Sequence, residues 1–160
     1  MSTKEQFILL TGIPGSGKTY VGEHLRDKHG FFFYCTDLNG LAVTNDLVTQ
    51  WLSLHGKKVC LEWGFHPCDL NLVLKLREQG ATVFWLKCAE DIAFRNYCEK
   101  HAENDPKGYY MIKQLERIKA AGLPQSQGSN FIIIDTYPNR KEIPREELAQ
   151  KILRRLRYDK

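Results

Sequence analysis

The sequence lacks any apolar run long enough to cross a membrane, and it has neither internal repeats nor low-complexity segments. A helical membrane span needs about 18 or more apolar residues. The apolar run within the N-terminal stretch MSTKEQFILLTG is too short for a signal peptide. With 160 residues, the chain can bury a core without needing a disulfide or a metal. We therefore expect a single cytoplasmic domain over residues 1–160, with no membrane partner.

Paired cysteines are also missing. The chain has five cysteines, an odd number, and no two of them form a CxxC pair. Cys35, Cys60 and Cys88 lie inside apolar runs typical of strands, so we expect buried, reduced thiols and a reducing compartment. His66 and Cys68 lie close together but have no partners at metal-ligand spacing, and no zinc site is predicted.

A strong charge of one sign is the third missing feature. Twenty-three basic residues face 19 acidic ones, which leaves a net charge of only +4. This balance suits an anionic ligand, but it does not by itself indicate nucleic acid. The function must therefore be inferred from motifs and not from composition.

Short apolar runs alternate with longer stretches of helical periodicity along the chain. Runs such as QFILLT are apolar at successive residues, as in strands buried on both faces of a parallel sheet. Strands that alternate with helices predict a three-layer α/β/α sandwich, here with a five-stranded parallel sheet. The predicted strands are 6–11, 31–35, 58–62, 81–88 and 130–135, and the predicted helices are 18–28, 41–55, 67–79, 90–102, 107–121 and 145–158.

The segment 100–130 departs from this alternation. It holds a predicted helix with no strand beside it in the sequence, and the breaker sequence NDP lies near its start. Ligands of parallel sheets bind beyond the carboxyl ends of the strands. We interpret the segment as a helical lid over a site at that edge of the sheet, and not as a second domain.

Residues 12–19, GIPGSGKT, match the Walker A pattern G-x-x-x-x-G-K-[ST] between a predicted strand and a predicted helix. The glycines let the backbone curl so that its N–H groups point at phosphates, and the helix adds the positive end of its dipole. Lys18 is expected to reach the β- and γ-phosphates of ATP or GTP, and the Thr19 hydroxyl to bind Mg²⁺. The residues predicted to hold the nucleotide are Gly12, Pro14, Gly15, Ser16, Gly17, Lys18 and Thr19.

Asp37 follows the second predicted strand, in the sequence YCTDLNG. In small-molecule kinases, a carboxylate at this place can accept the proton of the attacking hydroxyl. Asp37 also precedes a predicted helix, where aspartate is a common N-cap. Both hypotheses stay open at this point, with the general base favoured.

Glu62 ends the third predicted strand and is followed by Trp63 in the sequence EWGF. An apolar strand that ends in a carboxylate has the Walker B arrangement, in which the carboxylate holds Mg²⁺ through water. Alternatively, Glu62 binds the substrate or is a solvent-facing strand end. Trp63 either lines an acceptor pocket or packs in the core.

Over about residues 5–135, these motifs together resemble the P-loop kinases grouped with zeta toxins and polynucleotide 5′-hydroxyl kinases. Many members of that group carry Asp-Trp-Gly-Phe where this chain has EWGF. The resemblance implies the strand order 2-3-1-4-5. It also implies that Asp37 is the general base, that Lys18 binds phosphate and that Thr19 binds magnesium.

The same resemblance extends to the predicted lid. Arg95 and the asparagine after it match an Arg-Asn element on the helix that leads into the family's lid. The family's second lid arginine is replaced here by Glu99, so either Lys100 or Arg117 substitutes for it, or phosphotransfer is weak. In the proposed mechanism, a cation from Arg95, Lys100 or Arg117 closes over the transferring phosphoryl group. The stretch after Asp37 lacks the basic residue that polynucleotide kinases use, which makes a nucleic-acid acceptor possible but not favoured.

The predicted function is ATP- and Mg²⁺-dependent phosphorylation of a hydroxyl on a small molecule or a nucleotide. A second hypothesis is an NTP hydrolase or a nucleotide-dependent switch, with water as its only acceptor. A third is a nucleic-acid 5′-hydroxyl kinase. The sequence leaves the acceptor, the preferred base and the oligomeric state open.

Overall fold

The computed structural model describes residues 6–35, 49–50, 53, 58–63 and 70–158. A five-stranded sheet lies at its centre, and every adjacent pair of strands is parallel. Its order, β2-β3-β1-β4-β5, confirms the predicted architecture and strand order. The strands are β1 (Gln6–Gly12), β2 (Phe32–Cys35), β3 (Lys58–Glu62), β4 (Ala81–Lys87) and β5 (Ile132–Asp135).

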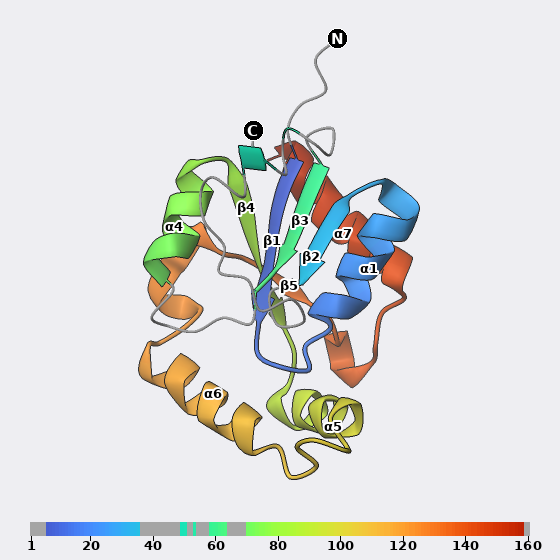
Figure 1. Ribbon diagram of the computed structural model, residues 1–160, viewed down its shortest axis with the longest axis vertical. Coiled ribbons are helices and arrows are strands. Elements are labelled where there is room, and N and C mark those ends of the chain that lie inside the picture. Colours follow the sequence, from blue (N-terminus) through green and yellow to red (C-terminus); the bar gives the residue numbers. More distant parts are fainter. Residues whose placement is uncertain (1–5, 36–48, 51–52, 54–57, 64–69, 159–160) are drawn as a thin grey trace.

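Helices cover both faces of the sheet, as Figure 1 shows. The described helices are α1 (Lys18–His29), α4 (Leu70–Glu78), α5 (Glu90–Lys100), α6 (Tyr109–Ala120) and α7 (Arg145–Tyr158), with short 3₁₀ turns at Gln125–Asn130 and Pro138–Arg140. α1 and α7 lie on one face, α4 lies on the other, and α5 and α6 lie beyond the carboxyl ends of the strands (Figure 1). Most of the predicted helix 41–55 falls outside the described residues.

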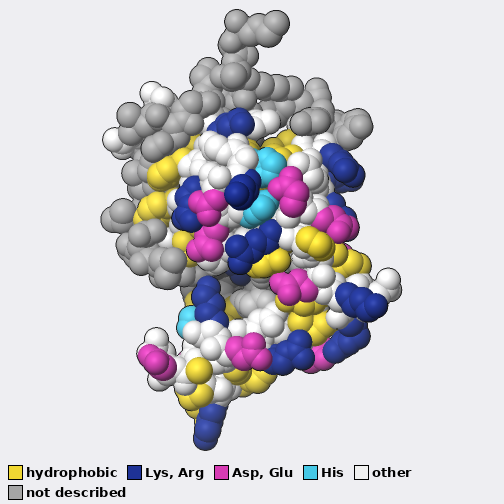
Figure 2. All heavy atoms as spheres, turned by 90° about the vertical axis from the view of Figure 1, so that its right-hand side faces the viewer, with side chains coloured by type: hydrophobic (Ala, Val, Ile, Leu, Met, Phe, Trp, Pro, Cys, Tyr) yellow, Lys and Arg dark blue, Asp and Glu magenta, His cyan; other side chains and the backbone are white. Residues whose placement is uncertain are grey.

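The structure bears on two features that the sequence lacks, a strong charge of one sign and a membrane-spanning helix. Basic and acidic side chains are interspersed on the face that Figure 2 shows, which is the side of α1 and α7. Among the described helices, none combines the length and the apolar character that crossing a membrane requires.

β1 organises the core because its side chains alternate between the two faces of the sheet. Phe7 and Leu9 belong to a buried cluster that includes residues of α4, α5 and α6. Ile8 and Leu10 belong to a second buried cluster, formed with residues of α1 and α7. Burial on both faces explains why the sequence of this strand is continuously apolar.

α6, in the segment predicted to be a lid, contributes to the first of these clusters. Met111 and Ile118 are buried in it, although Ile112 and Tyr110 are exposed. At the start of the helix, the Asp105 carboxylate accepts hydrogen bonds from two backbone N–H groups, those of Tyr109 and Tyr110. The helix is therefore packed in the core on one side and capped at its start, while its role as a lid over the site stays a prediction.

The buried thiols expected from the sequence are present. Cys35, Cys60 and Cys88 are buried, and none of the cysteines in the described ranges forms a disulfide. Burial raises the pKa of the Cys60 thiol well above its usual range and that of Cys88 to about 11, so both stay protonated at neutral pH.

The packing of α6 can be tested with two neighbouring residues. Met111→Ala should lower the free energy of unfolding by about 2–5 kcal/mol, because it leaves a cavity in the first cluster. Ile112→Ala, which changes an exposed residue of the same helix, should change it by less than about 0.5 kcal/mol. Urea unfolding of both variants measures the difference. Equal, small losses would mean that α6 is not part of the core.

Candidate functional site

The glycine loop connects the end of β1 to the start of α1, at the carboxyl edge of the sheet. Gly15 and Gly17 have positive φ angles of 79° and 101°, which favour glycine. A Cβ atom on Gly15 would lie 2.1 Å from the backbone oxygen of Ala93 in α5, whereas one on Gly17 would meet nothing within 4 Å. Gly15 is therefore held against the protein, and Gly17 faces open space at the start of the helix.

Two polar side chains of the loop region are buried in ways that suit an anion. The Lys18 ammonium group donates hydrogen bonds to the backbone oxygens of Gly12 and Ile13, at 3.3 and 2.9 Å. The Ser16 hydroxyl is fully buried and has no hydrogen-bond partner among the described residues. A buried polar group normally has a partner, so a phosphate oxygen at this loop fits the donors that are present.

Thr19 and Glu62 are in direct polar contact at the site. The Thr19 hydroxyl lies 2.8 Å from both carboxylate oxygens of Glu62 and donates its hydrogen between them. Glu62 ends β3 opposite Leu10 of β1, and it is only 4% exposed. Hydroxyl and carboxylate oxygens are the ligands that Mg²⁺ prefers, so this pair fits the ion that the sequence predicts.

Asn96 in α5 joins the glycine loop to the segment that follows β5. Its side-chain nitrogen donates hydrogen bonds to the backbone oxygen of Gly15, at 3.3 Å, and to the hydroxyl of Tyr137, at 3.0 Å. Burial raises the pKa of Tyr137 against the opposing effect of Asn96, so the phenol stays neutral. These contacts set the position of the loop relative to α5.

The loop, α5 and the segment after β5 surround a cavity of about 770 Å³. Part of its lining comes from α1, the segment before α7 and the start of α7, where the Arg145 guanidinium lies 4.2 Å from the centre of the Tyr20 ring. Another part comes from α5, α6 and the turn between them, with Lys100, His101 and Tyr110. The cavity therefore extends beyond the phosphate-sized space at the loop.

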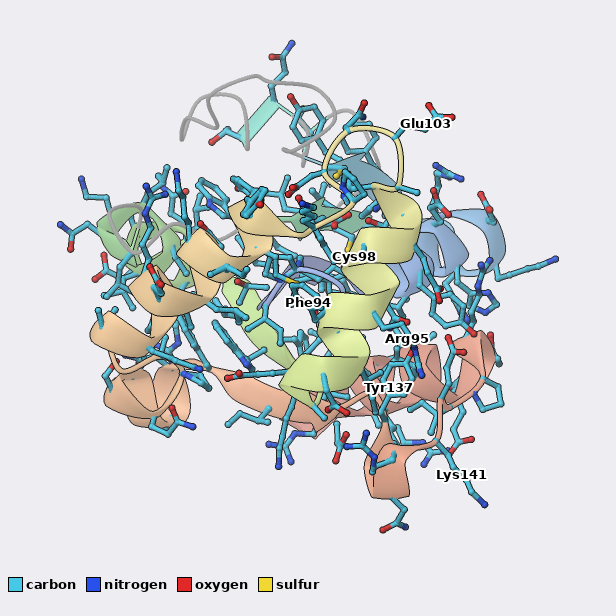
Figure 3. The ribbon with its side chains drawn as sticks, turned by 90° about the horizontal axis from the view of Figure 1, so that it is seen from below. Phe94, Arg95, Cys98, Glu103, Tyr137 and Lys141 are labelled. Atoms are coloured by element: carbon cyan, nitrogen blue, oxygen red, sulfur yellow. The ribbon has the colours of Figure 1, made fainter. Side chains whose placement is uncertain are left out.

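Most of the residues predicted for the site line this one cavity. They are Gly12, Pro14, Gly15, Ser16, Gly17, Lys18, Thr19, Glu62 and Lys100. Within the described ranges, Arg95 and Arg117 are exposed and do not line it. Figure 3 shows Arg95 on the flank of α5 near Tyr137, opposite the flank that carries Phe94 and Cys98.

Two further predictions concern residues near the strand ends. Asp37 lies outside the described residues, so its role as a base or a cap stays a prediction. Trp63 is buried in the first core cluster and is not part of the described lining of the cavity, which favours the core alternative for this side chain.

Sequence reasoning did not assign Asn96, Tyr137 or Arg145 to the site. Tyr137 could have been found, because it comes two residues after the end of β5, at the edge where ligands bind. The sequence marked Asn96 as part of the Arg-Asn element but gave its side chain no role, and nothing in the local pattern marks Arg145 at the start of α7. Their positions depend on contacts between residues that are distant in the sequence. Asn96 and Gly15, for example, are hydrogen-bonded although they are 81 residues apart in the chain.

A five-stranded parallel sheet in the order β2-β3-β1-β4-β5, with a glycine loop after β1, defines the fold of the P-loop kinases. Solved structures with this fold are similar to the chain over nearly its whole length. They include a shikimate kinase from Acinetobacter baumannii (TM-score 0.65, 19% identity, 98% of this chain and 96% of that one) and a gluconokinase from Sinorhizobium meliloti (TM-score 0.59, 21% identity, 94% and 91%). A sugar kinase from Janibacter is also similar (TM-score 0.61, 17% identity, 94% of both chains).

Sequence comparison finds a curated relative that is longer than this chain. No family model matches the chain. A nucleotide-binding protein from Lactobacillus acidophilus is 27% identical over 162 aligned positions, which cover 94% of this chain and 53% of that protein. The chain thus spans about half the length of the curated relative that it matches.

The contrast between Gly15 and Gly17 gives a test of the loop. Both alanine variants put a side chain at a positive φ, which costs about 1–2 kcal/mol. Gly15→Ala should cost about 1–3 kcal/mol more, because its Cβ would collide with the backbone of Ala93. Thermal or urea unfolding measures both variants. Equal destabilisation would show that the loop does not pack against α5 as described.

Proposed function

We propose that the chain transfers the γ-phosphoryl group of ATP to a hydroxyl of a small molecule or a nucleotide. The observation that carries the proposal is the partly buried Thr19–Glu62 pair at the foot of the glycine loop, with a hydroxyl and a carboxylate in contact at 2.8 Å. The similar solved structures, named as shikimate, gluconate and sugar kinases, support phosphoryl transfer to a small molecule. The curated relative supports nucleotide binding.

The glycine loop, Lys18, Thr19 and Glu62 each have a defined task in this proposal. The glycine loop and Lys18 hold the β- and γ-phosphates, with Lys18 exchanging its loop carbonyl partners for phosphate oxygens. Thr19 and Glu62 hold Mg²⁺, directly or through water. When bound, the ion neutralises charge on the phosphates.

Asp37 is the proposed general base. Cys35, at the end of β2, lines the cavity, and Asp37 is two residues further along the chain. Asp37 lies outside the described residues, so its role as the base rests on its place in the sequence and on the resemblance to the P-loop kinases.

The size and lining of the cavity favour an acceptor other than water. A hydrolase needs room only for the nucleotide and a water molecule, whereas this cavity also reaches Lys100, His101 and Tyr110. Lys100 is the proposed cation over the transferring group, since it lines the cavity. Arg95 and Arg117 would have to move to reach it.

A nucleic-acid acceptor is less well supported. A groove for a nucleic-acid strand is expected to be rich in lysine and arginine. The charged residues of the described lining, apart from His101, are balanced: Lys18, Lys100 and Arg145 against Glu23, Glu62 and Glu142. Membership in the zeta-toxin and polynucleotide-kinase group, which rests partly on EWGF, therefore stays a proposal.

Hydrolysis or a nucleotide-dependent switch is the second candidate function. The name of the curated relative mentions nucleotide binding and no transfer reaction. In that case the aromatic part of the cavity would bind the nucleoside or a partner, and not an acceptor.

A screen of acceptors tests the proposal. The chain is incubated with γ-labelled ATP, Mg²⁺ and panels of sugars, sugar acids, cyclic polyols, nucleosides and a 5′-hydroxyl oligonucleotide. We expect label on one class of small molecule. Label only in free phosphate would instead support the hydrolase, and label on the oligonucleotide would support the third hypothesis.

Variants make the screen specific. Asp37→Asn should lower transfer by roughly 10²-fold with unchanged nucleotide affinity, as for loss of a general base. Lys18→Ala should weaken nucleotide binding by roughly tenfold or more. Asp27→Asn, which changes an exposed aspartate of α1, is the matched control and should change neither quantity. Normal transfer with a lower melting temperature in Asp37→Asn would make Asp37 a helix cap.

A variant of Glu62 distinguishes a role in Mg²⁺ binding from a role in acceptor binding. If Glu62 holds Mg²⁺, Glu62→Gln should raise the Mg²⁺ concentration for half-maximal activity by roughly tenfold or more while ATP still binds. Glu23→Gln removes the same charge from the same cavity and keeps the hydrogen bonds between Thr19 and Glu62, so it should leave the Mg²⁺ requirement unchanged. An unchanged Mg²⁺ requirement with a raised KM for the acceptor in Glu62→Gln would place Glu62 on the substrate instead.

A further inference from the structure

Two histidines and a glutamate meet on the face of the molecule covered by α1 and α7. His24 and His29 belong to α1, and Glu146 belongs to α7, more than a hundred residues away. The Nε2 atoms of His24 and His29 lie 2.6 and 3.0 Å from the same oxygen, Oε2 of Glu146. Figure 2 looks onto this side and shows histidine side chains beside acidic ones near the centre of the face.

The carboxylate is oriented by a fourth residue. Gln150, one turn further along α7, donates a hydrogen bond of 2.7 Å to Oε1 of Glu146, which leaves Oε2 directed at the two imidazoles. Hydrogen bonds from Gln150, then His24 and His29, lower the pKa of Glu146 to about 2, so the group is ionised at neutral pH. An outer residue that fixes a carboxylate in this way is a common feature of metal sites.

The donor set is that of a zinc ion. One ligand atom from each of the three side chains lies within 4.8 Å of the other two. Two imidazole nitrogens and one carboxylate oxygen are a known three-ligand set for Zn²⁺, with a fourth position left for water. Hard ions such as Mg²⁺ prefer oxygen ligands only, so this cluster and the Thr19–Glu62 pair suit different metals.

We propose that His24, His29 and Glu146 form a Zn²⁺-binding site that links α1 to α7. Zn²⁺ takes the place of the hydrogens shared between the imidazoles and the carboxylate, so binding requires unprotonated Nε2 atoms. The displaced hydrogen moves to Nδ1 of a neutral ring, or leaves to solvent from a ring that carries hydrogens on both nitrogens. The histidine side chains are 15% and 20% exposed and that of Glu146 is 52% exposed, so the ion can enter from solvent and keep a water ligand. The proposal is independent of phosphoryl transfer.

Zinc titration of the metal-free chain tests the site. Isothermal titration calorimetry should show one Zn²⁺ per chain, and Zn²⁺ should raise the melting temperature, because it binds only when α1 and α7 are packed together. Glu146→Gln and His29→Gln should each weaken Zn²⁺ binding by roughly tenfold or more. Glu147→Gln changes the adjacent exposed glutamate of α7 and is the matched control, with affinity unchanged.

Cobalt distinguishes this site from binding at the cysteines. Co²⁺ bound at the proposed site should give visible absorption without a thiolate charge-transfer band, and Mg²⁺ should not displace it. Equal Zn²⁺ affinity in the wild type and both site variants, a thiolate band, or no binding at a tenfold excess of Zn²⁺ would overturn the proposal. His29→Gln and Glu146→Gln change different helices, so if one fails to fold, the other still decides.

Discussion

β1 is hydrogen-bonded to β3 on one edge and to β4 on the other, and its side chains are buried on both faces of the sheet. The candidate site depends on this position. Pairing with β3 places Glu62 opposite Leu10, close to where β1 ends and the glycine loop begins. The carboxylate therefore meets Thr19, which lies in the first turn of the helix after the loop.

The loop is held from a second direction by α5. The backbone of Ala93 closes against Gly15, and the amide of Asn96 holds the Gly15 carbonyl together with Tyr137. α5 is in turn tied to α6, because the Tyr97 hydroxyl donates a hydrogen bond of 2.9 Å to Asp105, the residue that caps α6. A displacement of α6 would therefore be transmitted through α5 to the glycine loop, which gives the predicted lid a physical connection to the site.

α1 contributes side chains to both of the proposed metal sites. Its first turn carries Lys18 and Thr19, which face the cavity with oxygen-rich partners. His24 and His29 lie further along the same helix and face α7, where nitrogen ligands meet one carboxylate. Because hard and borderline metal ions prefer these different ligand sets, the two places can be occupied independently.

The sequence alone determined the five strands and the position of the glycine loop. Apolar runs and helical periods gave the five strands in their correct places, and the Walker A pattern located the loop within eight consecutive residues. Glu62 could be proposed because the carboxyl ends of parallel strands meet at one edge. All of these inferences rest on neighbouring residues or on a general property of parallel sheets. The strand order itself came from the resemblance to a family and not from periodicity.

Tertiary structure decided the rest. Only the folded chain brings Asn96 to Gly15, Arg145 to Tyr20 and Glu146 to the two histidines of α1. It also placed Trp63 in the core and left Arg95 and Arg117 outside the described lining of the cavity. The physical reason is that such contacts depend on how helices pack on the sheet. The local sequence predicts whether a residue is helical, but it does not predict which side chain from a distant part of the chain that residue will contact.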